Sequence, residues 1–214
     1  MSYIPFFQEK FTELKKKYPD HKPIVIVDGL SGVGKNTVAK VFQEELEKRG
    51  IKLSIKDASE FFRPVAKEMG YENLDEFAEA RRKDLELAKK VDVKLDTDML
   101  EHGLKNGGII TGRIMIGVFG DEADIKVFVT ADADKIAERI SKDKERKDFG
   151  KPVEEIKKRI VNRDKSDIAT YEKLYNIDYK EVEIPNALII KNDKDVNEIR
   201  RQVSIIVNLV EGIL

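Results

Sequence analysis

Hydrophobic and polar positions alternate between two patterns along this chain. Short apolar runs predict buried strands at residues 24–28, 52–56, 108–111, 125–129 and 187–190. Between these runs the apolar residues mostly follow the three-to-four-residue spacing of amphipathic helices. Strands that alternate with helices predict an α/β fold, with a five-stranded parallel sheet covered by helices on both faces.

The segment from 24 to 37, IVIVDGLSGVGKNT, joins the first predicted strand to a helix through a glycine-rich turn. Four consecutive β-branched residues are typical of a strand that is buried on both faces. The glycines let the backbone turn sharply, and the positive end of the helix from about Thr37 points at the same place. This context fits the phosphate-binding loop (P-loop) and predicts a three-layer P-loop NTPase fold that binds a nucleoside triphosphate. A glycine-rich turn that binds nothing is the alternative.

The side chains at the end of this loop suggest how the phosphates are held. Lys35 supplies a positive charge that reaches the terminal phosphates. Asn36 occupies the usual Ser/Thr position, so we assign the Mg²⁺-facing role to Thr37, which offers the missing hydroxyl. Asp28 either orients metal-bound water or anchors the turn as a buried polar group. The residues expected to bind ATP are Gly29, Leu30, Ser31, Gly32, Val33, Gly34, Lys35, Asn36 and Thr37.

Composition narrows the class of protein and of partner. The chain has 214 residues, and its 40 Lys and Arg against 41 Asp and Glu leave a net charge of −1. We therefore expect a small-molecule phosphate acceptor, with no nucleic-acid or membrane partner, in a monomer or homodimer. The absence of cysteine excludes disulfides and thiolate chemistry, and two histidines exclude a histidine-rich metal site. No apolar run approaches 18 residues, which predicts a cytoplasmic protein.

Two segments are longer than a strand crossover requires, and both are mostly helical in pattern. The stretch between the second and third strands far exceeds the dozen or so residues of a minimal crossover, and predicts an acceptor-binding insert at residues 60–105. The stretch from 133 to 176 is highly charged and is interrupted by DFGKP at 148–152, which fits a hinged lid at residues 140–170. Solvated helix faces are the alternative for most of its charges.

The first 23 residues form a predicted helical extension to a single domain spanning 24–214. Phe7, Phe11, Leu14 and Tyr18 recur at helical spacing and predict a helix that packs on this domain. A membrane-surface or partner-binding helix is the alternative, although its apolar face is short.

Three further segments, together with the loop, resemble the cytidylate kinase family in its compact archaeal form. Residues 57–63 (DASEFFR) resemble the family segment whose arginine meets the acceptor phosphate. Gly112-Arg113 and the strand after it resemble the Gly-Arg segment of the family. Residues 163–167 (RDKSD), followed by YEKLYNID at 171–178, resemble the end of the archaeal lid. The likeness runs from residue 24 to the C-terminus.

This resemblance implies an ATP- and Mg²⁺-dependent nucleoside monophosphate kinase, with CMP or dCMP as the favoured acceptor. It implies that Arg63 and Arg113 hold the acceptor and that Arg159 and Arg163 arrive on lid closure. The implied catalytic residues are Lys35, Arg113, Arg159 and Arg163, and the implied acceptor-binding residues are Asp57, Ser59, Phe62, Arg63 and Arg113.

The departures from the family concern the acceptor side. Thr170 stands where the family has a second lid arginine, and Thr111 replaces an acid beside the Gly-Arg pair. At 95–98 the chain has LDTD where archaeal members tend to have Asp-Arg-Arg. Two alternatives therefore stay open: a P-loop kinase acting on a sugar, nucleoside or other small metabolite, and a non-catalytic nucleotide-binding regulator.

Overall fold

The computed structural model describes residues 4–20, 22–146, 148–175 and 187–210, and it confirms the predicted α/β fold. All strand pairings are parallel, and the sheet order is β2-β3-β1-β4-β5. Strand β1 lies at the centre, and its last residue, Asp28, stands opposite Gly112 of β3. The strands are β1 (Ile24–Asp28), β2 (Ile55–Asp57), β3 (Gly108–Gly112), β4 (Ile125–Thr130) and β5 (Leu188–Lys191).

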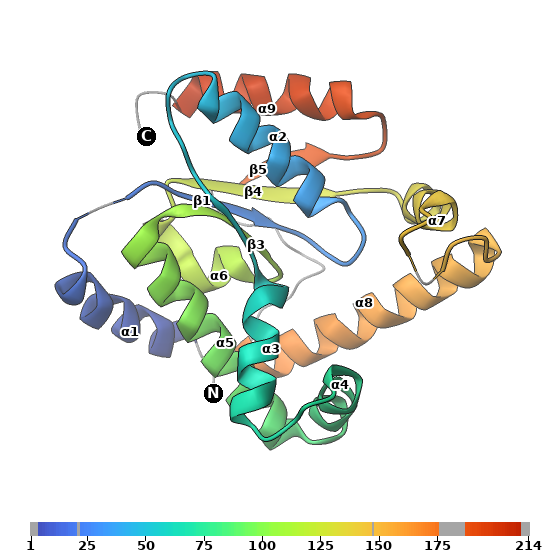
Figure 1. Ribbon diagram of the computed structural model, residues 1–214, viewed down its shortest axis with the longest axis horizontal. Coiled ribbons are helices and arrows are strands. Elements are labelled where there is room, and N and C mark those ends of the chain that lie inside the picture. The colour runs from blue at the N-terminus through green and yellow to red at the C-terminus, as the bar shows by residue number, and fades with distance from the viewer. Residues whose placement is uncertain (1–3, 21, 147, 176–186, 211–214) are drawn as a thin grey trace.

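Helices cover both faces of the sheet, as Figure 1 shows. Helices α2 and α9 lie on one face, whereas α1, α5 and α6 lie on the other, with α3, α4 and α8 extending beyond them (Figure 1). Their bounds are α1 (Ile4–Lys17), α2 (Lys35–Glu47), α3 (Ala58–Glu68), α4 (Leu74–Lys83), α5 (Leu85–Asn106), α6 (Met115–Phe119), the 3₁₀ turn η1 (Gly120–Glu122), α7 (Ala133–Lys142), α8 (Val153–Tyr175) and α9 (Val196–Val210).

Strand β1 explains the two-sided core. Val25 and Val27 lie in the cluster formed with α2 and α9, whereas Ile24 and Ile26 lie in the cluster formed with α1 and α5. All four are at most 1% exposed, and burying each such side chain contributes roughly 1.5–3 kcal/mol. The uninterrupted apolar run is therefore a consequence of a central strand with helices on both sides.

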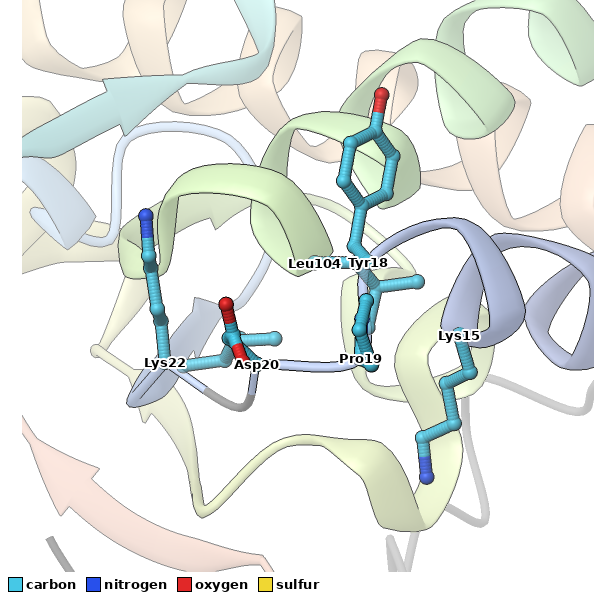
Figure 2. Close-up of a pocket in the computed structure, with 7 residues that line it drawn as sticks. Lys15, Tyr18, Pro19, Asp20, Lys22 and Leu104 are labelled. Carbon is cyan, nitrogen blue, oxygen red and sulfur yellow. The ribbon is translucent and has the colours of Figure 1, made fainter.

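The N-terminal helix packs on the second of these clusters. Phe11 and Leu14 are buried there, and Phe11 meets Phe119 edge to face with ring centroids 6.3 Å apart. The side chain of Phe7 lies outside the described part of the chain. A hollow of about 240 Å³ separates the end of α1 from β1 and α5 (Figure 2); it is lined by Lys15, Tyr18, Pro19, Asp20, Lys22, Ile24 and Leu104. It contains no residue of the phosphate loop.

Two predicted boundaries were wrong by a few residues. The second strand begins at Ile55 and not at residue 52, because β2 lies at the edge of the described sheet and its pairing with β3 begins at Ile55, opposite Ile109. Helix α2 begins at Lys35, two residues before Thr37, because the left-handed Gly34 (φ 93°) ends the loop there. Among the described residues, no helix is long and apolar enough to cross a membrane.

Candidate active site

The loop between β1 and α2 packs so closely on neighbouring residues that two of its glycines have no room for a side chain. Gly29 (φ +147°) lies so close to β4 that a Cβ there would stand 2.4 Å from the Val129 carbonyl oxygen. At Gly34 (φ +93°) a Cβ would stand 2.2 Å from Asn192 Nδ2. A larger residue at either position would force the loop or its neighbour to move, so the loop depends on glycine for space as well as for conformation.

A buried asparagine beyond the last strand fixes the far end of the loop. Asn192 is 1% exposed, and its Nδ2 donates to the Val33 carbonyl oxygen at 2.7 Å. Its backbone N–H donates to the Thr130 carbonyl, which ties the same residue to β4. Sequence reasoning missed Asn192, since nothing local distinguishes it from other polar residues that follow a strand.

Asp28 at the end of β1 holds two turns together. Its Oδ1 accepts from the backbone N–H of Gly29 at 2.6 Å and of Ile114 at 3.0 Å, and its Oδ2 accepts from Ile116 at 3.0 Å. Ile114 has φ 64°, an unfavourable conformation for a β-branched residue, and these bonds stabilise it. Asp28 thereby joins the phosphate loop to the turn that carries Arg113. Of its two possible roles, these contacts support the buried anchor.

The ammonium of Lys35 folds back over its own loop. Nζ donates to the carbonyl oxygens of Gly29 at 2.7 Å and Leu30 at 2.8 Å. Burial, with a further contribution from the nearby positive charge of Arg113, lowers the pKa of Lys35 to about 8. A phosphate that enters the loop would add its negative charge to those of Asp28 and Asp57, which already favour the ammonium.

The residues after Lys35 are compatible with a magnesium ion. Thr37 is exposed in the first turn of α2, beside the loop. Mg²⁺ in phosphate-transfer sites takes one or two protein oxygens and completes its shell with water and substrate phosphates. One hydroxyl beside a phosphate cradle fits that donor set. Within the described residues, no group of three or more His, Asp or Glu could hold a metal by itself.

On the other side of the loop, Asp57 joins β2 to α3. Its Oδ1 accepts from the backbone N–H of Ser59 at 2.8 Å, which caps α3, and its Oδ2 accepts from the Thr111 hydroxyl at 2.6 Å. Burial opposes its charge, but the hydrogen bonds from Ser59 and Thr111 outweigh burial and lower the pKa of Asp57. Phe62 packs on Phe77 with centroids 4.9 Å apart, and Arg63 is exposed on α3.

Helix α8 brings further charges to the same region. Arg113 forms an ion pair with Asp167, and Arg163 Nε lies 3.8 Å from the same carboxylate. Asp164, one turn earlier, accepts from the backbone N–H of Ser31 at 3.4 Å, and burial raises its pKa. Lys35 interacts electrostatically with both Arg113 and Arg163. Three cations from separate chain segments therefore gather around the phosphate loop.

The structure does not bring Arg159 to this group. Its guanidinium pairs with both carboxylate oxygens of Asp148, in the turn between α7 and α8. A different arginine, Arg139 on α7, lies closer to the loop: its Nη1 would be 3.8 Å from a Cβ at Gly34. Sequence reasoning gave Arg139 no role, because it is one of many charges in a helical segment. Residues 176–178, the last part of the lid resemblance, lie outside the described residues.

Comparisons with known proteins identify the family of this chain. A family model described as an AAA domain (AAA_18) matches residues 25–162, which is more than half of the chain. A cytidylate kinase of Methanocaldococcus jannaschii is 30% identical over 184 residues, covering 85% of this chain and 95% of that one. A cytidylate kinase of Ignicoccus hospitalis is 32% identical over 161 residues, covering 75% of this chain and 85% of the relative.

Among solved structures, an unliganded sugar kinase from Janibacter sp. HTCC2649 aligns over 90% of this chain and 98% of that chain. The TM-score is 0.47 and the identity is 19%, which is too distant to bear on the acceptor. The chain belongs to the cytidylate kinase family, and it is an ATP-dependent kinase.

Proposed function

We propose that this protein transfers the γ-phosphoryl group of ATP to a nucleoside monophosphate, with CMP or dCMP as the favoured acceptor. The observation that carries the proposal is the gathering of Lys35, Arg113 and Arg163 around one phosphate loop. Phosphoryl transfer asks little covalent chemistry of a protein and depends on positioning and on neutralising spread negative charge. A group of cations at the loop suits a reaction between two phosphorylated molecules.

Each residue then has a distinct task. The amides of the loop and Lys35 hold the β and γ phosphates of ATP, and Thr37 would hold the Mg²⁺ that neutralises part of their charge. Arg113 and Arg63 hold the acceptor phosphate, whose oxygen attacks the γ phosphorus as the bond to the ADP oxygen breaks. Arg163 neutralises the equatorial oxygens of the group in transfer.

The acids around these cations suggest what happens before substrates arrive. Asp167 pairs with Arg113, and Asp164 accepts from Ser31, whose N–H belongs to the phosphate loop. We infer that phosphates displace these contacts, so that α8 shifts as the site fills. In this proposal residues 140–170 act as a lid, Arg159 leaves Asp148 on closure, and residues 60–105 hold the acceptor. We propose that the reaction takes place in the cytoplasm.

ADP release, measured for the purified protein over a panel of acceptors, tests the proposal. The panel contains CMP, dCMP, UMP, AMP, GMP, cytidine and several sugars, with Lys35→Ala as the inactive control. We expect CMP or dCMP to give the highest kcat/KM. Acceleration by a sugar or a nucleoside, with none by any monophosphate, would replace this proposal with a metabolite kinase.

A further inference from the structure

Asp57 and Thr111 face each other at the carboxyl end of the sheet. They are register partners in the parallel pairing of β2 with β3, and the buried Thr111 hydroxyl donates to Asp57 Oδ2 at 2.6 Å. Thr111 stands where the family has an acid, so β3 brings only a hydroxyl to this position. The carboxylate at this point of the sheet comes instead from β2, the neighbouring strand.

Both side chains lie on the face of the sheet that α2 covers. Ile109 belongs to the apolar cluster formed with α2 and α9, and Thr111 follows it by two residues on the same strand, which places both side chains on one face. The Thr111 hydroxyl is also 3.4 Å from Asn36 Oδ1, in the first turn of α2. Asp57 is therefore linked through Thr111 to the turn that carries Thr37, the residue proposed to hold Mg²⁺.

Asp28 and Asp57 both act electrostatically on Lys35, but they lie on opposite faces of the sheet. Asp28 follows Ile26 by two residues and so points toward the cluster on the other face. Three backbone N–H groups already donate to its carboxylate. Of these two acids, only Asp57 lies on the face where the first turn of α2 begins.

The carboxylate of Asp57 is fixed in place and can accept a further hydrogen bond. Its Oδ1 accepts from the N–H and the hydroxyl of Ser59, and its Oδ2 accepts from Thr111. Each carboxylate oxygen can accept two hydrogen bonds, so Oδ2 has capacity for one more. Burial opposes ionisation, but the bonds from Ser59 and Thr111 lower the pKa of Asp57, which keeps it ionised at neutral pH.

A magnesium ion held by a single protein hydroxyl depends on acceptors outside its first shell. Mg²⁺ keeps several water molecules when the protein supplies only one or two ligands. Those water molecules donate hydrogen bonds, and a carboxylate that accepts from one of them fixes its orientation. Removing such an outer acceptor typically costs about 10–100-fold in metal affinity.

We propose that Asp57 Oδ2 accepts a hydrogen bond from a water molecule of the Mg²⁺ held at Thr37, and that Thr111 fixes the carboxylate for this purpose. Asp57 is then a positioning residue on the ATP side of the site, which differs from the acceptor-binding role that the family resemblance implies for it. The acid that β3 lacks is supplied from β2. This inference rests on the proposed Mg²⁺ site and is independent of which acceptor is phosphorylated.

ATP binding in the absence of acceptor tests this role. Calorimetry gives the ratio of the ATP dissociation constants without and with Mg²⁺, which should exceed one for the wild-type protein. Asp57→Thr removes the carboxylate and keeps a residue type that caps helices, so α3 should be retained. We expect the ratio to fall about tenfold, with the metal-free dissociation constant within about twofold.

Glu60→Gln is the matched control. Glu60 is an exposed acid in the first turn of the same helix, where its Oε1 accepts from the Asp57 N–H at 3.0 Å, and glutamine can accept the same bond. This variant should leave the ratio unchanged. The exchanged variant Asp57→Thr/Thr111→Asp returns a carboxylate from the other strand and should recover most of the ratio, which a loss of helix capping would not explain.

Two outcomes would overturn this inference. An unchanged ratio in Asp57→Thr, with a raised acceptor KM, would assign Asp57 to the acceptor. An equal fall in Glu60→Gln would reduce the effect to the loss of any nearby negative charge. If Mg²⁺ does not tighten ATP binding to the wild-type protein, the site at Thr37 fails and this inference fails with it. Failure of CMP and dCMP as acceptors would overturn the proposed function alone, because ATP binding is measured without them.

Discussion

The ATP-binding half and the proposed acceptor-binding half of the site differ in whether backbone or side chains form them. The donor side is mainly backbone: residues 29–34 turn between β1 and α2, and Lys35 bonds to two carbonyl oxygens of the same loop. The proposed acceptor side consists of side chains from α3, α4, α5, α8 and the turn after β3. Its charges pair across these elements, as in Arg113–Asp167 and Arg81–Asp92.

This difference predicts different consequences of mutation. A backbone cradle is preformed and binds phosphate with little rearrangement, so damage to it should weaken both ATP binding and transfer. Cations that are already paired with carboxylates must exchange those partners for phosphate. Damage on that side should therefore appear in the rate of transfer and in the choice of acceptor, with ATP binding nearly intact.

The largest effect is expected for Lys35→Ala. The ammonium neutralises donor charge, and its hydrogen bonds go to two loop carbonyls and not to the core, so kcat should fall by about 10³-fold while the fold is retained. Steady-state kinetics and circular dichroism measure the two quantities. Lys40→Ala, at an exposed position on the same helix, is the control and should behave like the wild type. A kcat within about threefold of the wild type would show that the loop is not catalytic.

Arg163→Ala should slow phosphoryl transfer and leave ATP binding nearly intact. We expect kcat and kcat/KM to fall together by about 10²-fold with an ATP dissociation constant within about twofold, because in the proposed mechanism the arginine meets the phosphoryl group mainly in the transition state. The alternative is an exposed i,i+4 pair with Asp167, worth only about 0.3–0.5 kcal/mol. Arg201→Ala removes a comparable exposed arginine on α9 and is the control. A rate loss below about threefold would identify Arg163 as a surface residue.

The same contrast explains how far the sequence could predict the site. The phosphate loop is one contiguous segment whose glycines and flanking strand are local signals, and the five strands follow from local apolar runs. The partners of the loop are not local: Asn192 reaches Val33 across 159 positions, and Asp28 reaches Ile116 across 88. Only tertiary packing shows which polar residues are buried.

The charged residues of α8 and α5 illustrate the harder case. Arg159 and Arg163 lie one turn apart and look equivalent in sequence, yet one pairs with Asp148 and the other lies near the phosphate loop. Asp92 is one acid among many in a helical pattern, and its burial depends on how α4 packs against α5. The roles given to Arg63, Arg113, Arg159 and Arg163 stay predictions until variants are measured.

Gly34→Ala tests whether the cradle depends on space as well as on backbone conformation. The added Cβ would stand 2.2 Å from Asn192 Nδ2, and Gly34 has φ +93°, so either the loop or the Asn192 side chain that anchors it must shift, and ATP affinity should fall at least tenfold. Gly50→Ala is a close control, because Gly50 has φ +81° with nothing within 4 Å of its Cβ position. It should cost about 1 kcal/mol in the free energy of unfolding and leave ATP binding unchanged. Equal ATP affinities in the two variants would contradict a role for the contact with Asn192.

The smallest expected effect is a proton linked to donor binding. With a pKa of about 8, Lys35 is mostly protonated at pH 7 and mostly neutral at pH 8.5 in the free protein. Bound phosphate favours the ammonium and raises this pKa, so binding should take up most of a proton at pH 8.5 and little at pH 7. The protonated fraction falls by about fourfold over that interval, and ATP affinity should fall by the same factor.

Calorimetry in buffers of different ionisation enthalpy measures the proton uptake directly, and Arg113→Gln checks its origin. The positive charge of Arg113 contributes to the lowered pKa of Lys35, so its removal should move the loss of ATP affinity to higher pH. A loop that held ATP through backbone amides alone would bind it with equal affinity at pH 7 and pH 8.5, because amides do not titrate in this range. Equal ATP affinity at pH 7 and pH 8.5, without proton uptake, would therefore mean that Lys35 keeps its ordinary pKa. It would also mean that the charge of Arg113 does not change the pKa of Lys35.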